Sequence, residues 1–367
     1  MSNSTIQTPE LVVTNFHRRF TGVSATADAV VSEQLNQFRL CLVGDKLPSG
    51  PAPISYRQAI SLCRKPPENR PFAIWHVRRN LEMAAAIFAR DVLRLPIRIV
   101  FTSAAQRLHS VVPRHLIAKM DAVVATTAKA ATFVPNLAAV VPHGVDTTRF
   151  TPAENRAASW ASLGYGGQYG IGIVGRVRPE KGTDLFVDAM IQVLPERPEF
   201  TAIIIGRTMP SDAAFEAALR SRIQAAGLSD RILFVGEHPP HEMPKIIRSL
   251  SLLVAPARYE GYGMTPLEAM ASGVPVVASK TGAYEEMIGG GVAGRIVEVD
   301  DLSGLARAIA ETSGNPEDLR DLGESAVDRA NQHFSLSCEV ANIGIVYESL
   351  WGQKQARTSK AVAITAR

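Results

Sequence analysis

The sequence predicts an α/β protein built from two doubly wound parallel-sheet domains. Its 367 residues are 46% hydrophobic, which is enough for two domains of ordinary size, each with its own core. Short apolar runs alternate with segments of helical periodicity in both halves, and this alternation is typical of parallel sheets covered by helices on both faces. The expected strands are residues 11–16, 39–44, 73–77, 97–102, 122–127 and 139–142, followed by 169–175, 200–206, 232–236, 252–257, 274–278 and 294–299.

The domain boundary is expected where glycine and proline interrupt this alternation. Pro152, Gly164, Gly166 and Gly167 form such an interruption. We therefore assign residues 1–155 to an N-terminal domain and residues 156–334 to a C-terminal domain. An amphipathic helix is expected over residues 335–352. Residues 353–367, which mix small, basic and polar side chains, are expected to form a flexible tail.

Composition limits the class of protein. The chain has three cysteines, Cys41, Cys63 and Cys338, and their spacing suggests neither a disulfide framework nor a zinc cluster. The first residues lack a basic region followed by an apolar one, and no uninterrupted apolar segment is long enough to span a bilayer. These features predict a cytoplasmic protein that is neither secreted nor membrane-spanning.

The net charge of +4 is unevenly distributed along the chain. Residues 1–157 contain 19 Lys and Arg against 10 Asp and Glu, whereas residues 158–367 contain 20 against 25. The basic first half favours an anionic partner, either a phosphorylated lipid surface, an acidic sugar or a nucleic acid. The alternative is a solvated basic face without a dedicated partner. A nucleic acid fits least well, because the basic residues are not interleaved with aromatic stacking residues.

The most informative stretch runs from residue 255 to residue 279. It reads as a strand, a loop rich in glycine and proline, a helix start and a second strand. Glu260 and Glu268 bracket Gly261, Gly263 and Thr265, so bare backbone N–H groups can approach an anion at a helix N-terminus while the acids reach hydroxyl groups. A ligand with both phosphate and sugar hydroxyls fits this pattern. The alternative is that this stretch binds no ligand and is only a turn between core elements with two exposed glutamates.

The string EGYGMTPLEAMASGVPVV, with its Glu260-x7-Glu268 spacing, resembles the signature of retaining family 4 glycosyltransferases. The resemblance implies the GT-B fold of two facing Rossmann-like domains, with the helix over residues 335–352 packing back on the first domain. It implies that Glu260 lies beside the donor sugar and that Glu268 binds the ribose. The loop residues that would hold the diphosphate are Gly261, Gly263, Met264 and Thr265. Side chains and backbone near Gly206 and Glu237 would read the base, although these residues alone leave guanine and uracil open.

A second motif follows the strand expected at residues 169–175. Its glycines match a dinucleotide-binding pattern, but they lie inside the apolar run rather than in a turn, so a nicotinamide site is not predicted. The string from Arg176 to Gly182 resembles the family motif that supplies Arg and Lys to the donor diphosphate. Arg176 can bind phosphate oxygens bidentately, and Lys181 can place a charge on the leaving phosphate. The alternative is a solvated basic turn.

These groups could support glycosyl transfer from a nucleotide diphosphate sugar. Arg176, Lys181 and the loop amides would stabilise the charge that grows on the leaving diphosphate. This chemistry needs neither a cofactor nor a metal, and the sequence has no paired D-x-D carboxylates of the metal-dependent type. Resemblance to the family implies retention of anomeric configuration, in which Glu260 positions the sugar rather than acting as a general acid.

The acceptor-binding side is expected in the N-terminal domain. The first strand leads into a basic loop that contains Arg18, Arg19 and Gly22, and Gly22 is the single clear match to the family's Gly-Gly pair. The third strand ends in His76, Arg78 and Arg79 at an edge where open sheets bind ligands. Two adjacent guanidinium groups suit a carboxylate or phosphate on the acceptor. The alternative is a core histidine beside a solvated arginine pair.

After the fourth strand the family often carries a histidine, and this chain has Ser103 nearby instead. We expect the hydroxyl of Ser103, which we assign to the acceptor side, or that of Thr102 to serve as the contact in its place; the alternative is that His76 takes part of this role.

A closer resemblance, from about residue 12 to residue 350, is to the lipopolysaccharide-core mannosyltransferases of rhizobia. It rests on RPFAIWHVRRNLEM, RDVLRLPIRIVFTSAAQRLHS and PHGVDTTRF. It implies transfer of mannose from GDP-mannose to a Kdo residue on a lipid A precursor at the cytoplasmic face of the inner membrane. Residues 81–95 combine apolar side chains with arginines and could form an interfacial helix, or could simply pack on the sheet. The alternatives are another donor, such as UDP-glucose, for a capsular, surface or storage glycan, or a nucleotide-binding module without catalysis.

Overall fold

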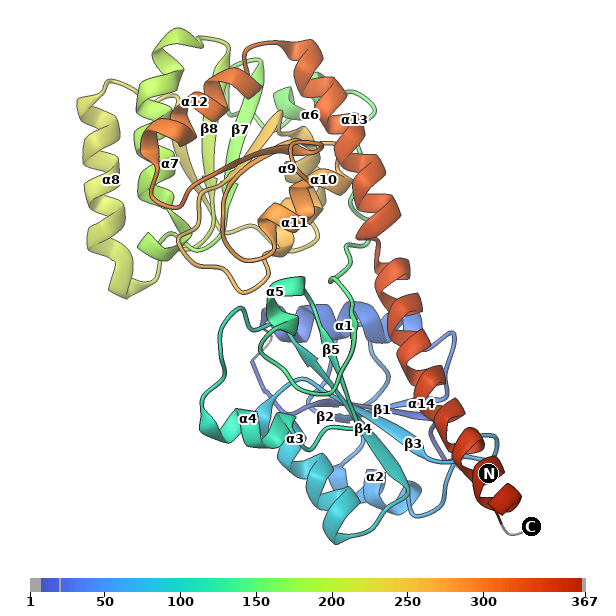
Figure 1. Ribbon diagram of the computed structural model, residues 1–367. Coiled ribbons are helices and arrows are strands. Elements are labelled where there is room, and N and C mark those ends of the chain that lie inside the picture. The colour runs from blue at the N-terminus through green and yellow to red at the C-terminus, as the bar shows by residue number, and fades with distance from the viewer. Residues whose placement is uncertain (1–7, 20, 365–367) are drawn as a thin grey trace, which may run out of the picture. The chain divides into compact units, whose positions relative to one another are not determined.

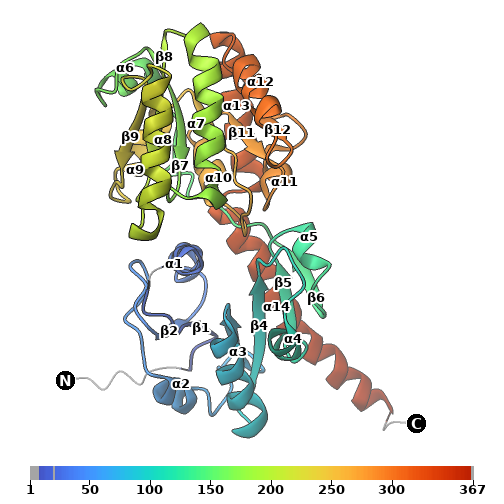
Figure 2. The ribbon, with the colours of Figure 1, turned by 90° about the vertical axis from the view of Figure 1, so that its left-hand side faces the viewer.

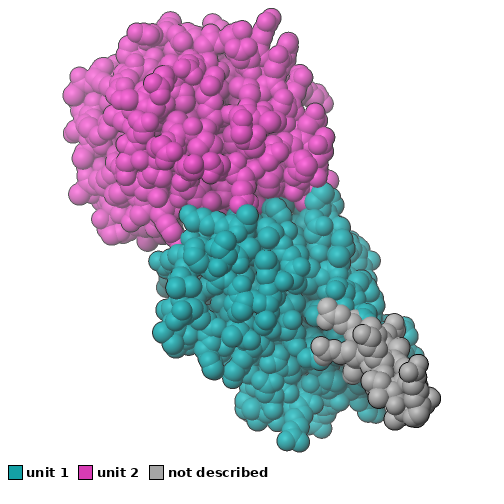
Figure 3. Space-filling model, in the orientation of Figure 1, with its two compact units in different colours: residues 1–144, 336–367 teal, residues 145–335 magenta. Residues whose placement is uncertain are grey.

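The computed structural model describes residues 8–19 and 21–364, with side chains described as far as residue 352. Contacts divide the chain into two compact units, shown in two colours in Figure 3. Unit 1 consists of residues 1–144 and 336–367, and unit 2 of residues 145–335. The expected boundary lay between residues 155 and 156. The contact division lies earlier because the Val145 N–H donates to the Phe334 carbonyl (2.8 Å) and Phe150 is buried in the core of unit 2.

Unit 1 is built on a six-stranded parallel sheet. The strand order is β2-β1-β3-β4-β5-β6, so the order reverses between β1 and β3. The first crossover places β2 at one edge, and the later strands extend the sheet in the other direction. The strands are β1 (Leu11–Asn15), β2 (Leu40–Gly44), β3 (Ala73–Val77), β4 (Ile97–Ser103), β5 (Ala122–Ala125) and β6 (Leu137–Val140).

Helices cover both faces of this sheet. One apolar core lies between the sheet, α1 and the last helix, and includes Leu11, Val31 and Tyr347. A second core lies on the opposite face and includes Trp75, Met83 and Ile117. The helices are α1 (Gly22–Gln34), α2 (Tyr56–Leu62), α3 (Asn80–Ile87), the π-helix η1 (Phe88–Val92), α4 (Val111–Ile117), α5 (Ala128–Ala131) and α14 (Leu336–Ile364).

The last helix joins residues far apart in sequence within unit 1. The indole Nε1 of Trp351 donates to the Phe72 carbonyl (3.0 Å), and Tyr347 is fully buried against the sheet. Figure 1 shows α14 in red along the first unit. We expected residues 353–367 to form a flexible tail. The helix continues to Ile364, and residues 365–367 lie outside the described part of the chain.

Unit 2 repeats the architecture with a second six-stranded parallel sheet. Its order is β12-β11-β10-β7-β8-β9, and the reversal falls between β7 and β10. Ligands in open α/β sheets bind at the carboxyl ends of the strands where such a reversal occurs. The strands are β7 (Tyr169–Val174), β8 (Phe200–Ile205), β9 (Ile232–Gly236), β10 (Leu252–Ala255), β11 (Val276–Ser279) and β12 (Gly294–Val297).

The helices of unit 2 also form two layers. One core packs α7, α8 and α12 on the sheet through residues such as Phe186, Leu219 and Ile309, and Figure 2 shows α7 and α8 beside each other on one face. The other core includes Met270, Met287 and Ala326. The helices are α6 (Arg156–Ala161), α7 (Thr183–Val193), α8 (Ala213–Ala225), α9 (Met243–Ser249), α10 (Met264–Ala271), α11 (Tyr284–Ile288), α12 (Leu302–Thr312) and α13 (Pro316–His333), with short 3₁₀ turns η2 (Pro179–Lys181), η3 (Leu194–Glu196) and η4 (Pro210–Asp212).

Over residues 8–19 and 21–364, no helix combines the length and the apolar character that a bilayer crossing requires. The same residues contain no group of three or more His, Cys, Asp or Glu side chains placed to hold a metal ion.

Candidate active site

Two loops of unit 2 meet at the reversal between β7 and β10. Gly182 adopts a left-handed conformation (φ 69°), and a Cβ atom there would lie 1.9 Å from the Pro256 carbonyl oxygen. Only glycine permits this approach. The Arg258 N–H also donates to the Glu180 carbonyl (3.0 Å). The turn after β7 and the loop after β10 are therefore held together by their backbones.

Arg258 fixes the same two loops through its side chain. Its guanidinium binds both carboxylate oxygens of Asp184 (2.8 Å each), and its Nε donates to Asp300 (2.6 Å). A bidentate arginine–carboxylate pair has a defined geometry as well as favourable energy. Hydrogen bonding to Asp184 raises the pKa of Arg258, so this cation stays charged.

Lys181 and Glu260 meet in this junction. The Lys181 Nζ forms an ion pair with Glu260 Oε2, and the two side chains are 25% and 18% exposed. The Gly261 N–H donates to Glu260 Oε1 (3.1 Å), and the hydroxyl of buried Tyr284 lies 3.5 Å from Oε2. A small pocket at the ends of β7 and β10 is lined by Lys181, Thr265 and Tyr284. A cation, a carboxylate and a phenol thus share one partly buried site.

The start of α10 provides the backbone groups expected to meet an anion. Gly263 precedes the helix with φ 91° and, as a glycine, has no side chain that could cap its first turn. Met264 and Thr265 are the first two residues of α10. A helix N-terminus with uncapped N–H groups favours a phosphate. Gly263 also lies so close to the Tyr284 ring that a Cβ atom would come within 2.3 Å of it.

Glu268 lies one turn further along α10. Burial raises the pKa of its carboxyl to about 7, and the charge of Arg149 acts in the opposite direction. The Arg149 guanidinium in turn donates to the Pro240 carbonyl. A carboxyl of this kind is desolvated and ready to exchange hydrogen bonds with hydroxyl groups, which is the chemistry that a ribose presents.

The other predicted donor residues of unit 2 lie at the same carboxyl edge of its sheet. Arg176 is exposed in the turn after β7. Gly206 follows β8 and lies against the turn after β7, because a Cβ atom there would be 1.8 Å from the Gly175 carbonyl oxygen. Glu237 follows β9, is 62% exposed and lies 3.8 Å from the Arg207 Nε. The structure therefore brings the predicted donor residues to one edge, although Glu237 has only a weak, solvated ion pair.

His76 is a core residue. Its side chain is 0% exposed, its Nδ1 lies 2.5 Å from the Tyr347 hydroxyl and its Nε2 lies 2.7 Å from the Thr102 hydroxyl. Burial, and then the charge of Arg78, hold the pKa of His76 well below its usual value, so the ring is neutral. These contacts favour the core alternative for His76 over the expected acceptor contact. Ser103 is likewise 1% exposed and lies 3.3 Å from His109 Nε2.

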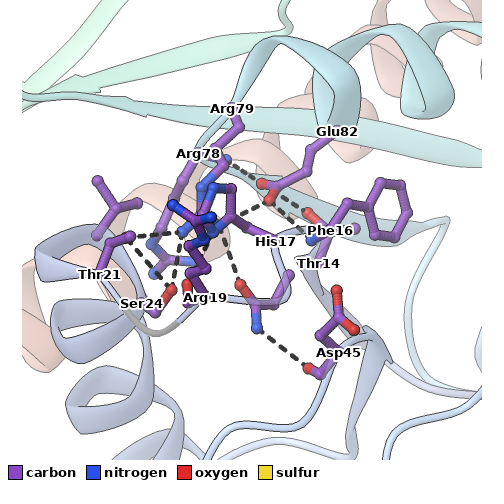
Figure 4. A network of polar contacts seen from close by, with 12 residues as sticks. Thr14, Phe16, His17, Arg19, Thr21, Ser24, Asp45, Arg78, Arg79 and Glu82 are labelled. Carbon is purple, nitrogen blue, oxygen red and sulfur yellow. Dashed lines mark hydrogen bonds and ion pairs between the residues drawn. The ribbon is translucent and has the colours of Figure 1, made fainter.

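Arg79 is engaged within the protein. Its Nη1 donates to Glu82 Oε1 (3.0 Å) and to Asn15 Oδ1 (3.0 Å), and its Nη2 donates to the Ser24 hydroxyl (2.9 Å). Figure 4 shows Arg79 reaching from the end of β3 to the start of α1. Its main role in the described structure is to hold the loop after β1.

The remaining predicted residues of unit 1 surround this clamp. Arg18 and Arg19 are exposed in the loop after β1, and Gly22 is the exposed first residue of α1. Arg78 is partly exposed and follows β3 directly. Unlike Arg79, the other arginines of this edge form no ion pair with another described residue. They are Arg18, Arg19 and Arg78.

Several site residues were not predicted from the sequence. Tyr284 and Arg258 position Glu260 and its loop, while Glu82 anchors Arg79. Arg149 faces Glu268. Arg258 lies within the most informative stretch, so its position was a usable signal, but its partner Asp184 could be identified only in three dimensions.

These features define a protein with two parallel-sheet units, one of which carries a glycine-preceded helix N-terminus beside a lysine–glutamate pair. The family described as glycosyl transferases group 1 matches residues 156–329. The chain is 44% identical over 352 residues to the lipopolysaccharide core biosynthesis mannosyltransferase LpsB of Rhizobium meliloti (strain 1021), covering 94% of this chain and 99% of that protein. It is 42% identical to LpcC of Rhizobium leguminosarum bv. viciae, a mannosyltransferase of the same description, with 96% and 99% covered.

Solved structures agree with this assignment. Anabaena Alr3699/HepE in complex with UDP matches with a TM-score of 0.79 at 17% identity, covering 93% of this chain and all of that one, and so supports the fold alone. The C-terminal domain of LpcC from Francisella tularensis matches with a TM-score of 0.51 at 35% identity and covers 52% of this chain and 99% of that one. The chain is a GT-B glycosyltransferase. It belongs to the group 1 glycosyl transferases and is similar to the rhizobial core mannosyltransferases.

Proposed function

We propose that this enzyme transfers mannose from GDP-mannose to a Kdo residue of the lipopolysaccharide inner core, with retention of configuration as in family 4. The observation that carries the proposal is similarity to two lipopolysaccharide core mannosyltransferases over nearly the whole chain. Because the similarity includes unit 1 as well as unit 2, it bears on the acceptor as well as on the donor.

The donor would bind at the junction of the two loops of unit 2. Lys181 and Arg176 would neutralise the diphosphate, and the N–H groups at the start of α10 would bind its oxygens. Charge on this leaving group grows as the anomeric bond breaks, so preorganised donors stabilise the transition state more than the ground state. No metal takes part in the proposed step.

Glu260 and Glu268 would hold the two sugars of the donor. The Lys181 ion pair and Tyr284 already orient the Glu260 carboxylate beside the proposed diphosphate site. When the diphosphate binds Lys181, the ion pair between Lys181 and Glu260 would break. The Glu260 carboxylate would then be free to bind the hydroxyls of the transferred sugar. Glu268, desolvated on α10, would bind the ribose hydroxyls. Gly206 and Glu237 would help to read the base.

The acceptor would bind at the carboxyl edge of the unit 1 sheet. Arg18, Arg19 and Arg78 supply positive charge there, which suits the carboxylate of Kdo or the phosphates of lipid A.

The enzyme would also contact the cytoplasmic face of the inner membrane. Apolar side chains of α3, η1 and α4 are well exposed, and α3 and α4 pack side by side. Exposed cations on or next to these elements, such as Arg94, Arg114 and Lys119, complement an anionic lipid surface. The apolar residues are Leu81, Phe88, Val92, Val111 and Val112, with Leu108 in the loop before α4.

The decisive experiment measures transfer of labelled sugar to a Kdo-bearing lipid A precursor in detergent. GDP-mannose, UDP-glucose and UDP-N-acetylglucosamine are tested in parallel, with a precursor lacking Kdo as the control. We expect incorporation from GDP-mannose that requires Kdo. Incorporation only from a UDP-sugar would keep the fold and the Lys181–Glu260 chemistry but would overturn the core-mannose assignment. No transfer from any donor, with retained nucleotide binding, would favour a non-catalytic nucleotide-binding module.

A further inference from the structure

Arg78 occupies the reversal point of the unit 1 sheet. It follows the last residue of β3, and β3 pairs with β1 where the strand order turns back. In open α/β sheets this crevice at the carboxyl ends is the place where ligands bind. In unit 2, Lys181 and Glu260 lie at the corresponding reversal. The topology alone therefore indicates a ligand-binding position at Arg78, whatever residue is found there.

No carboxylate of the described residues forms an ion pair with the Arg78 guanidinium. Its Nη1 is buried and has no hydrogen-bond partner among the described residues. Burial lowers the pKa of Arg78, while the nearby groups Tyr347, Glu82 and Glu339 raise it and Arg79 lowers it further. A cation that is partly desolvated and has no bonded anion destabilises the folded protein. Proteins retain such groups at sites where a ligand supplies the missing negative charge.

The two nearby carboxylates are committed to other groups. Glu82 accepts the Thr14 hydroxyl (3.1 Å), the Phe16 N–H (3.2 Å), the Arg79 Nη1 (3.0 Å) and the backbone N–H of Arg78 (2.8 Å). Glu339 lies 2.8 Å from His143 Nδ1 and accepts the Gly144 N–H (2.7 Å). Neither carboxylate accepts a hydrogen bond from the Arg78 side chain. These two carboxylates therefore reduce the free-energy cost of placing the Arg78 charge there, but neither of them binds its guanidinium.

The neighbouring arginine provides the contrast. Arg79 has every feature of a structural arginine, with a buried carboxylate and two further oxygens on its guanidinium. Figure 4 shows the two arginines leaving the end of β3 together, with the contacts of Arg79 drawn to Ser24 and Glu82. The sequence could not distinguish between them, and the contacts do.

We propose that Arg78, rather than Arg79, is the side chain that binds the carboxylate of the acidic acceptor sugar. The assignment rests on the proposed function, because it takes a Kdo-bearing acceptor as the ligand. A guanidinium offers two parallel N–H donors to a carboxylate, which fixes the orientation of the acceptor as well as its affinity. Arg18 and Arg19, exposed in the loop after β1, attract the same anion without ordering it.

Binding of free Kdo to the protein without donor tests this assignment. We would measure the melting temperature of the full chain with Kdo, with Kdo methyl ester and with inorganic phosphate. The variants are Arg78→Met, Arg78→Lys and Arg57→Met, the last of which removes an exposed arginine of α2 as a control for net charge. Kdo should raise the melting temperature of the wild type and of Arg57→Met, and its methyl ester should not.

Arg78→Met should melt at the same temperature as the wild type or higher, because a partly buried charge without a bonded counter-ion is removed, and it should not respond to Kdo. Arg78→Lys should respond weakly, since a lysine keeps the charge but loses the paired donors. In the transfer assay, Arg78→Met should raise KM for the Kdo-bearing precursor at least tenfold while protection by GDP stays unchanged.

Three results would overturn the assignment. An unaltered Kdo response in Arg78→Met would show that this side chain does not bind the carboxylate. A response to phosphate that exceeds the response to Kdo and needs Arg78 would assign the site to a lipid phosphate instead. A lower melting temperature with lost GDP protection would make Arg78 a structural residue. Because the Kdo measurement uses no donor, it remains informative if GDP-mannose proves to be the wrong sugar nucleotide.

Discussion

Lys181 and Glu260 form an ion pair through Nζ and Oε2 across 79 positions of the sequence. The pair joins the turn after β7 to the loop after β10, so the proposed phosphate-binding cation and the proposed sugar-binding carboxylate neutralise each other. Binding of a diphosphate would have to compete with Glu260 for Lys181. The same exchange would free the carboxylate for the sugar.

Replacing Lys181 by alanine should therefore impair transfer more than binding. Loss of one preorganised donor to a leaving group lowers kcat by about 10²–10³-fold. Glu260→Gln should lower kcat as well, because the sugar loses a charged partner. The measurement is steady-state transfer with the sugar-nucleotide donor.

Lys280→Ala is the matched control, since Lys280 forms an exposed pair with Glu285 (3.1 Å) in the same unit. It should leave kcat unchanged. Normal turnover by a folded Lys181→Ala variant would remove this lysine from the mechanism.

Glu268 should make the free energy of unfolding depend on pH. Its folded pKa of about 7 lies above the ordinary value of 4.5, so the folded protein holds this proton over a range where the unfolded chain has lost it. The ionised carboxylate therefore costs stability fully above pH 7, and this cost disappears as the pH falls towards 4.5. Glu268→Gln should be more stable than the wild type at pH 8, by about 1–3 kcal/mol.

Urea denaturation at pH 8 and at pH 4.5 checks this expectation, and the difference between the two proteins should vanish at the lower pH. Glu285→Gln, which changes an exposed carboxylate, should show no such pH-dependent difference. A constant difference at both pH values would mean that burial does not perturb Glu268.

Arg79→Met should destabilise unit 1. Glu82 is 0% exposed and its charge is balanced at 3.0 Å by Arg79, so the variant leaves a buried carboxylate with one cationic partner fewer. Breaking a buried pair of this kind costs about 3–5 kcal/mol. Chemical denaturation measures the loss, with Arg57→Met as the surface control. Wild-type stability in Arg79→Met would contradict the structural role that separates Arg79 from Arg78.

Binding to anionic vesicles should require the exposed apolar residues of α3, η1 and α4. Val92→Ser and Val111→Ser remove two of these side chains without changing charge, and together they should weaken sedimentation with anionic vesicles several-fold. Added salt should weaken wild-type binding steeply, because exposed cations supply the attraction. Ile345→Ser, on the exposed side of α14, is the control for general apolar loss. If added salt did not weaken binding to the vesicles, the exposed cations would not be the source of the attraction.

Much of the architecture could be predicted from the sequence. Leu302–Thr312 carries a strong apolar stripe, and a stripe of this kind specifies a helix by its periodicity alone. Helix α13 carries a weaker signal, since its 18 residues are mostly polar and only a few, such as Leu319 and Ala326, are buried. Residues 81–95 were considered as a single helix, whereas the chain changes to a π-helix at Phe88. Arg90 lies in that segment and binds Asp121 (2.6 Å), a partner that local pattern does not reveal.

Local periodicity and the glycines at a helix start were enough to predict the strands, the two parallel sheets and the loops that carry Glu260, Glu268 and Lys181. Which charged side chains are already bound to a partner could be read only from the folded chain. Arg78 and Arg79 are the same residue type at adjacent positions, yet one is clamped by Glu82 and the other has a buried Nη1 without a partner. His76 became a core residue because Tyr347 returns to it from the last helix. The physical reason is that burial and hydrogen-bond saturation depend on residues brought together from distant parts of the chain.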